Sequence, residues 1–138
     1  MRPARRTTAV PQRIAVYVRV APDRRGRGGL DRRTAALATT AARTPGWRHV
    51  ANYADCSLAR PWERPGLCRL LADAPWAFDV VVVDGYGQLA TDRSDLSWVL
   101  GQLAATGTAV VAVSRPSRRF LKVVGNLALA DLVAETAR

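Results

Sequence analysis

The chain has 138 residues, 49% of them hydrophobic, and a formal net charge of +10. That length suits one domain with its own core and leaves no room for a second large one. No apolar run approaches the ~20 residues of a membrane span, and residues 1–12 lack the apolar stretch of a signal peptide, so we expect a cytoplasmic protein with no membrane role. One histidine, His49, and two cysteines, Cys56 and Cys68, are too few for a zinc site or a disulfide framework. We expect no metal, and reduced thiols that serve as small packing residues.

Positive charge gathers near the N-terminus. Residues 1–33 hold ten arginines against Asp23 and Asp31, a balance of +8, which leaves +2 for the other 105 residues. A basic arm of this kind attracts nucleic-acid phosphates without reading sequence. The alternative is a solvated tail that reflects the composition of the whole chain, which contains 20 arginines and one lysine. The sequence leaves both interpretations open.

The first strand and helix follow a lead-in without periodicity. Residues 1–12 are expected to be disordered, ahead of a domain that spans residues 13–138. A strand is predicted over residues 14–18, and a turn rich in glycine and arginine over residues 24–29 leads to a helix that Pro45 ends. The apolar face of that helix is formed by Leu30, Thr34, Leu37 and Ala41.

The alternation of strand and helix then continues. Three further β-rich runs lie at residues 49–53, 78–83 and 109–113. A loop is predicted over residues 55–63, followed by a helix with Pro65 in its first turn, where proline is tolerated. Another helical pattern, ended by Gly107, precedes the last strand. Asp92 is expected to accept N–H groups at the start of that helix.

Strands that alternate with helices predict a three-layer α/β sandwich with a mainly parallel sheet of four to five strands. In such a fold the functional site lies at the C-terminal ends of the strands. We therefore expect the site near Arg19 and Asp84. Trp62 and Trp76, in loops that contain proline, are candidate contacts for nucleic acid, with packing at the edge of the core as the alternative.

Residues 116–138 are predicted to form a C-terminal helix with a wide apolar arc. One face carries Leu121, Val124, Ala128 and Leu132, and the adjoining face carries Phe120, Val123, Leu127 and Ala130. An arc this wide can bury one side on the domain and the other on a partner, or lie entirely on one sheet face. A basic patch at its start either contacts DNA or is a solvated helix end, and comprises Arg115, Arg118, Arg119 and Lys122.

Four motifs occur in order along the chain. They are residues 13–20, Gly29-Leu30-Asp31, Asp55 with Arg64-Pro65-Gly66-Leu67 nine residues later, and residues 78–83. Together they resemble the catalytic domain of the resolvase/invertase serine recombinases over about residues 13–136. The resemblance implies DNA binding and strand exchange in DNA recombination and integration. In that chemistry a serine hydroxyl attacks a DNA phosphodiester and arginines neutralise the developing charge, without a metal or other cofactor.

The resemblance places Arg19 and Arg64 on two phosphate-binding arginines of the family. Ala21 stands at the nucleophile position, just after the first strand, where the family has serine. Three further catalytic positions are lost: Gly87 replaces an aspartate, and Gln88 and Thr91 replace two arginines. Because phosphoryl transfer needs an oxygen nucleophile and several guanidinium groups at one phosphate, no intact catalytic set remains. The chain is predicted to be a pseudoenzyme.

Further departures from the family pattern surround the same positions. Arg33 replaces a glutamine of the first helix, and Leu58-Ala59 replace the Ser-Gly of a mobile loop. Each retained arginine also has a plainer interpretation, in which Arg19 holds the Asp84 carboxylate and Arg64 is solvated beside Glu63.

The sequence therefore predicts a degenerate serine recombinase domain that does not cleave DNA and binds the DNA backbone weakly. It would act as an accessory or regulatory partner of an active recombinase, or persist as the remnant of a mobile element. A homodimer, or a heterodimer with an intact serine recombinase, would form through the C-terminal helix. No separate DNA-binding domain is expected after that helix.

Two other functions remain open. One is an active recombinase or nuclease with a relocated nucleophile, for which Ser57 and Ser94 are the candidates. The other is a protein-interaction module with no DNA role.

Overall fold

The structure is a computed structural model that describes residues 10–22 and 26–114. Its elements run in the order β1 (Gln12–Val20), α1 (Gly26–Arg43), β2 (Trp47–Cys56), η2 (Pro61–Glu63), α2 (Pro65–Ala77), β3 (Val80–Val83), η3 (Tyr86–Gln88), α3 (Arg93–Ala105) and β4 (Ala109–Ala112). The predicted C-terminal helix, with Arg115, Arg118, Arg119 and Lys122, lies outside the described residues. None of the described helices is both long and apolar enough to cross a membrane.

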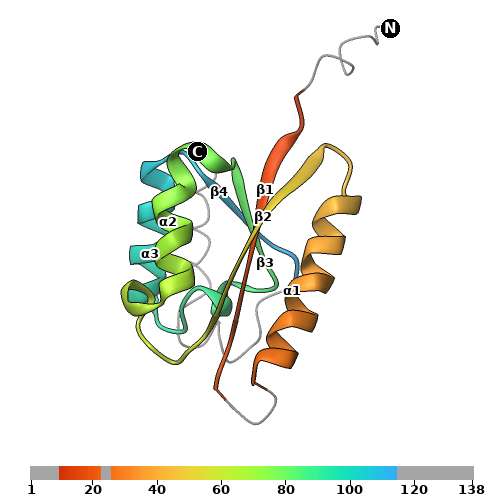
Figure 1. The fold of residues 1–138 in the computed structure, drawn as a ribbon. Coiled ribbons are helices and arrows are strands. Elements are labelled where there is room, and N and C mark those ends of the chain that lie inside the picture. The colour runs from red at the N-terminus through yellow and green to blue at the C-terminus, as the bar shows by residue number, and fades with distance from the viewer. Residues whose placement is uncertain (1–9, 23–25, 115–138) are drawn as a thin grey trace, which may run out of the picture.

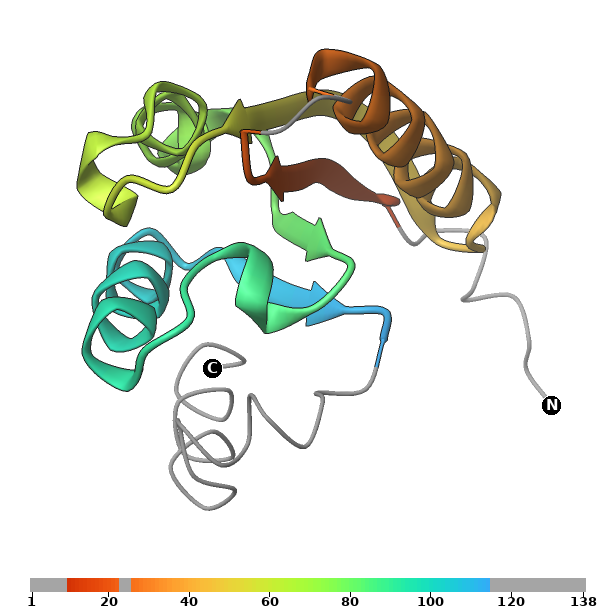
Figure 2. The same ribbon diagram turned by 90° about the horizontal axis from the view of Figure 1, so that it is seen from below.

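The four strands form one parallel sheet in the order β2-β1-β3-β4. Helix α1 covers one face of the sheet, and α2 and α3 lie side by side on the other (Figures 1 and 2). This arrangement confirms the predicted three-layer α/β sandwich. Strand β1 pairs with β2 on one side and with β3 on the other. The order in which strands are added to the sheet therefore changes sides between β1 and β3, which makes this place a topological switch point. Ligands of open α/β sheets bind at such points.

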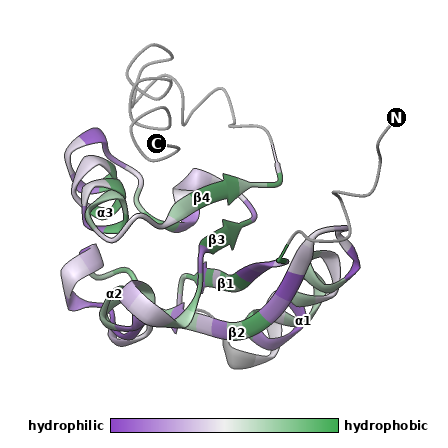
Figure 3. Ribbon diagram, turned by 90° about the horizontal axis from the view of Figure 1, so that it is seen from above, coloured by the Kyte–Doolittle hydropathy of each residue, from purple (hydrophilic) through white to green (hydrophobic). Residues whose placement is uncertain are grey.

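Alternating residues of β1 divide the core into two layers. Ile14, Val16 and Val18 are buried on the face that α1 covers, whereas Ala15 and Tyr17 belong to the cluster beneath α2 and α3. The alternation follows from the period of two in a strand. The colouring by hydropathy shows apolar β3 and β4 between the helical layers (Figure 3). The side chain of Arg19 therefore shares its face with Tyr17 and points away from α1.

Several predicted boundaries needed correction. Strand β1 spans Gln12–Val20 instead of residues 14–18, so its first residue lies in the lead-in that was predicted to be disordered. Helix α1 begins at Gly26, so the turn predicted over residues 24–29 is wrong in its C-terminal part. The glycines there indicated a turn, but packing of the apolar face of α1 against the sheet outweighs their low helix propensity. Strand β2 extends to Cys56, and residues 61–63 form a 3-10 turn, so the loop predicted over residues 55–63 is shorter. Pairing with β1 holds this strand extended up to the register Val20 to Cys56.

Three predictions about helix ends are confirmed. Pro65 is the first residue of α2. The Asp92 carboxylate accepts the N–H of Asp95 at 2.8 Å and caps α3. Gly107 has a φ of 73° and follows the end of α3, where a left-handed residue suits glycine.

Candidate functional site

The loops at the C-terminal ends of β1, β2 and β3 meet at one edge of the sheet. The N–H of Ser57, just after β2, donates to the carbonyl of Val20 at 3.0 Å. The N–H of Arg19 donates to Oε1 of Gln88, in the loop after β3, at 2.7 Å. Arg19, Ser57 and the loop that holds Gln88 are therefore brought together at this edge.

Arg64 is buried at the start of α2, with 4% of its surface exposed. Its Nε donates to the carbonyl of Ala59 at 3.0 Å, and its Nη1 donates to the carbonyls of Gln88 at 3.2 Å and Leu89 at 2.8 Å. The guanidinium thus ties the loop after β2 to the loop after β3. The interpretation of Arg64 as a solvated side chain beside Glu63 is wrong, because it is buried.

Arg19 is partly buried beside Arg64. Its Nη1 donates to the carbonyl of Ser57 at 3.2 Å, and its Nη2 lies 3.4 Å from the carbonyl of Gly87. Its buried Nε has no hydrogen-bond partner among the described residues. Burial, and then the neighbouring Arg64 guanidinium, hold the pKa of Arg19 below its ordinary value. The interpretation in which Arg19 holds Asp84 is wrong, since the Asp84 carboxylate instead accepts the hydroxyl of Ser114 at 3.0 Å.

Asp55 joins β2, β1 and α2 from a buried position. Its carboxylate accepts the N–H of Gly66 at 2.8 Å, the N–H of Leu67 at 2.9 Å and the hydroxyl of Tyr17 at 2.8 Å. Burial and the Asp55 carboxylate raise the pKa of Tyr17, so its hydroxyl stays protonated and donates. The close approach of α2 to β2 requires Gly66, because a Cβ there would lie 2.3 Å from the carbonyl oxygen of Ala54.

The four lost catalytic positions lie at or near the same edge. Ala21 is exposed just after β1, and its side chain carries only a methyl group. Gly87 and Gln88 are in η3, and Thr91 is exposed before α3. Gln88 stands at one of the lost arginine positions, and its side-chain oxygen accepts the backbone N–H of Arg19 in β1. The residues that replace the catalytic set therefore supply no additional cation.

The two proposed replacements for the nucleophile differ in their surroundings. Ser57 follows β2 beside Val20, its carbonyl accepts Arg19, and its hydroxyl accepts the N–H of Ala59 at 2.9 Å. Ser94 is exposed in the first turn of α3. Of these two residues, Ser57 is the one that contacts a retained arginine.

The exposed aromatic residues and thiols depart from expectation. Trp76 is 71% exposed, so packing at the core edge is wrong for it, and Trp62 is 44% exposed while its ring meets Trp98 edge to face at 5.3 Å. Cys56 and Cys68 are free and exposed, so their expected packing role is also wrong. In the described part of the chain, no cluster of three or more His, Cys, Asp or Glu residues could hold a metal ion.

Sequence reasoning missed what Asp55 and Gln88 do within the fold. No local signal showed that Asp55 would cap α2, because it lies in β2 and accepts the N–H groups of residues 11 and 12 positions away. No signal in the sequence showed that Gln88 would accept the N–H of Arg19, since that contact joins residues 69 positions apart.

Solved structures of similar fold are catalytic domains of serine recombinases. The N-terminal catalytic domain of TP901-1 integrase has a TM-score of 0.63 at 20% identity, covering 91% of this chain and 92% of that one. The C-terminal catalytic domain of ISC1926 TnpA, an IS607-like serine recombinase, has a TM-score of 0.63 at 18% identity, with 80% and 75% covered. A resolvase family site-specific recombinase from Streptococcus pneumoniae has a TM-score of 0.61 at 16% identity, with 87% of each chain covered.

The fold is thus that of a serine recombinase catalytic domain. The family described as Resolvase, N terminal domain, matches residues 14–135, and the chain belongs to that family. No curated protein matches the sequence.

Proposed function

We propose that this resolvase-family domain does not cleave DNA and acts as an accessory or regulatory partner of an active recombinase, holding the DNA backbone weakly. The observation that carries the proposal is the combination of Ala21 at the nucleophile position with retained guanidinium groups that already donate to backbone carbonyls.

The loss of cleavage follows from the chemistry that the site lacks. A methyl group cannot attack phosphorus, and loss of a nucleophile alone costs on the order of a millionfold in rate. Three of the five N–H groups of Arg64 already donate to the carbonyls of Ala59, Gln88 and Leu89, which leaves the two N–H groups of Nη2 for a phosphate. Any movement of the guanidinium toward a transition state would leave these carbonyls unpaired, and that cost opposes the recruitment of Arg64 to catalysis.

Weak DNA binding is supported by Arg19. Its charge is partly buried next to another cation, and its Nε lacks an acceptor among the described residues. An incoming phosphate would offset the repulsion from Arg64, and it would supply the missing acceptor once the side chain of Arg19 turns its buried Nε outward. Contacts of this kind are independent of sequence, so the binding should weaken steeply as salt rises.

Nicking of supercoiled plasmid tests the loss of cleavage. The wild-type chain, Ala21→Ser and Ala21→Gly are compared with an active serine recombinase catalytic domain as positive control. We expect no nicked product and no covalent protein–DNA adduct from any of the three, because Ala21→Ser restores the hydroxyl without the missing cations. Nicking by wild type would refute the proposal, and nicking by Ala21→Ser alone would show that a methyl group is the whole defect.

Binding to random duplex DNA tests the remaining function. Electrophoretic shift at rising salt should show a complex that Arg19→Ala weakens severalfold. Arg43→Ala is the matched control, because Arg43 lies in the last turn of α1, at the opposite end of the sheet. No complex even at low salt would remove the DNA role and leave the protein-interaction module.

Partnership with a recombinase needs its own measurement. The chain is mixed with an intact serine recombinase, and complex formation is followed by analytical ultracentrifugation, together with the recombination rate. A mixed oligomer and a changed recombination rate would support the accessory role. If both effects are absent, the result would favour the mobile-element remnant.

A relocated nucleophile is the second candidate, and Ser57 is the residue that favours it. Its backbone contacts both Val20 and Arg19, so its hydroxyl lies in the loop next to the lost position. If plasmid nicking occurs and Ser57→Ala abolishes it while Ser94→Ala does not, the domain is an active enzyme.

A further inference from the structure

A pocket of about 390 Å³ lies on the α1 face of the sheet, at the C-terminal ends of β1 and β3. Its volume falls within the ~300–1,000 Å³ usual for small-molecule sites. It occupies the switch point between β1 and β3, where open α/β sheets bind their ligands. Arg19 and Arg64 do not line it, whereas Gln88, which stands at a lost catalytic position and accepts the N–H of Arg19, does.

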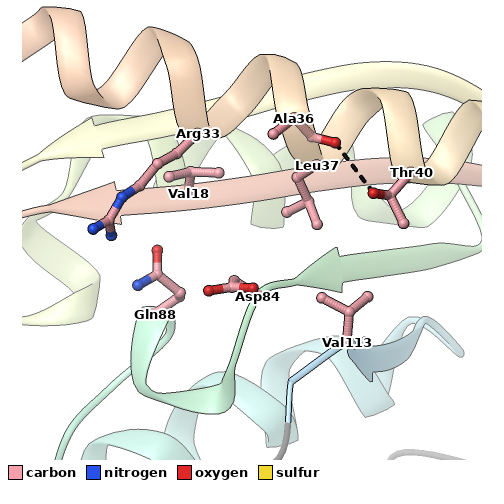
Figure 4. A pocket seen from close by; sticks show the side chains of 8 residues that line it. All are labelled: Val18, Arg33, Ala36, Leu37, Thr40, Asp84, Gln88 and Val113. Atoms are coloured by element: carbon pink, nitrogen blue, oxygen red, sulfur yellow. Dashed lines mark hydrogen bonds between the residues drawn. The ribbon is translucent and has the colours of Figure 1, made fainter.

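Three polar side chains project into the pocket from opposite sides (Figure 4). Arg33 comes from α1, and Asp84 and Gln88 come from the loop after β3. The Gln88 amide is oriented by its oxygen, which accepts the N–H of Arg19, and its NH₂ donates to no described residue. Arg33 forms no ion pair within the described ranges, and Asp84 receives one described bond, from Ser114 to its Oδ1. The pocket therefore offers a cationic donor, an amide donor and a carboxylate acceptor.

The remaining lining side chains are apolar except for that of Thr40, whose hydroxyl donates to the carbonyl of Ala36 at 3.2 Å (Figure 4). Val18 of β1 and Leu37 of α1 line one side, and Val113, which is 45% exposed, lines the other. A planar heterocycle between these side chains would cover Val113 and bury apolar surface on both of its faces.

We propose that this pocket binds a guanine mononucleotide, with the phosphate at Arg33 and Gln88 and the base edge at Asp84. A phosphate matches the guanidinium and amide donors. A carboxylate accepts the N1–H and the 2-amino group of guanine together, whereas adenine places an acceptor where guanine has N1–H. The pocket therefore selects guanine over adenine.

The same group can come from free GMP or from a 5′-phosphorylated guanine at the end of a DNA strand. Calorimetric titration of the full chain with GMP, with AMP and with a short single-stranded oligonucleotide that begins with 5′-phosphoguanine separates the two sources. We expect GMP to bind about tenfold or more tightly than AMP, since AMP loses a hydrogen bond to a charged group. If the oligonucleotide binds and GMP does not, the pocket is assigned to the end of a DNA strand.

Two pairs of variants test the contacts. Arg33→Ala and Asp84→Asn should each weaken GMP binding about tenfold or more, and Asp84→Asn should also reduce the preference over AMP. Arg32→Ala and Asp31→Asn are the controls, because both residues are exposed on the same helix and neither lines the pocket. Val113→Trp should abolish binding by filling the pocket, and the exposure of Val113 makes this variant compatible with folding.

Absence of binding by GMP and by the oligonucleotide at millimolar concentration would overturn the proposal. Equal affinity in wild type, Arg33→Ala and Asp84→Asn would overturn it as well, since the nucleotide would then bind elsewhere. The outcome is distinguishable from that of the duplex-binding experiment, because that experiment depends on Arg19, on the other face of β1.

Discussion

The polar residues near the C-terminal end of β1 differ between the two faces of the sheet. On the face beneath α2 and α3, Arg64 and Asp55 are buried and each makes three hydrogen bonds that hold loops and a helix together. On the α1 face, Arg33 and Asp84 are exposed at the edge of an open pocket. The residues kept from the family's pattern are thus largely engaged within the fold, while polar groups available for a ligand lie on the opposite face.

The difference shows why retention of a catalytic-type residue is weak evidence for retained catalysis. Asp55 and Arg64 connect the sheet to α2 and to the loop after β3, so their loss would destabilise the domain whether or not DNA is cleaved. Ala21, in contrast, is exposed and could change without structural cost. Variants that separate stability from binding can break or sharpen this comparison.

The largest effect is expected from Asp55→Ala. It leaves three donors without their acceptor, the hydroxyl of Tyr17 and the N–H groups of Gly66 and Leu67, and should lower the free energy of unfolding by about 4 kcal/mol. Asp73→Ala is the control, because Asp73 accepts one described bond, from Tyr53 at a part-buried position. Urea unfolding measures the free energy of unfolding of both variants. Equal losses would show that the three hydrogen bonds of Asp55 stabilise the domain no more than the single bond of Asp73.

Gly66→Ala tests the same connection through shape. A Cβ 2.3 Å from the carbonyl oxygen of Ala54 would push α2 away from β2, with an expected loss of about 3 kcal/mol. Gly101→Ala is the matched control in α3, since a Cβ there meets nothing within 4 Å. That change should stabilise the domain by about 0.5–1 kcal/mol, because alanine is the better helix former. A neutral Gly66→Ala in thermal unfolding would mean that the two elements separate freely.

Substitution of Arg64 should mainly lower stability, whereas substitution of Arg19 should mainly weaken DNA binding. Arg64→Met removes the donor from three backbone carbonyls and should cost about 2 kcal/mol of stability. Arg19→Met relieves repulsion with Arg64 and should change stability by less than about 1 kcal/mol, while it weakens duplex binding severalfold. Urea unfolding and electrophoretic shift on the same two variants check this. A large stability loss in Arg19→Met would assign both arginines to the structural group.

The sequence predicted the strands, helices and layers of the fold better than the contacts that its polar side chains make. The layers, the four strands, the first turn of α2 and the cap at Asp92 follow from local apolar patterns and helix-end chemistry. The burial of Arg64 does not, because it depends on carbonyls of residues 24 and 25 positions away, which no local pattern encodes. The start of α1 was misplaced for a related reason, since tertiary packing of an apolar helix face outweighed the local preference of glycine.

The smallest effect is expected far from both environments, at the start of β1. The side chains of Arg13 and Asp79 pair at 3.0 Å, and the Arg13 hydrogen bonds hold the pKa of Asp79 below its ordinary value. A carboxyl with a lowered pKa adds stability that is present above its unfolded pKa, about 4, and is lost as the pH falls through the folded pKa. Because both side chains are more than one third exposed, solvent screens the pair and the contribution is small. Thermal unfolding between about pH 6 and pH 2 should therefore decline slightly less in Asp79→Asn than in wild type. An equal decline in the two proteins would show that other carboxylates dominate acid unfolding and that this pair contributes nothing measurable.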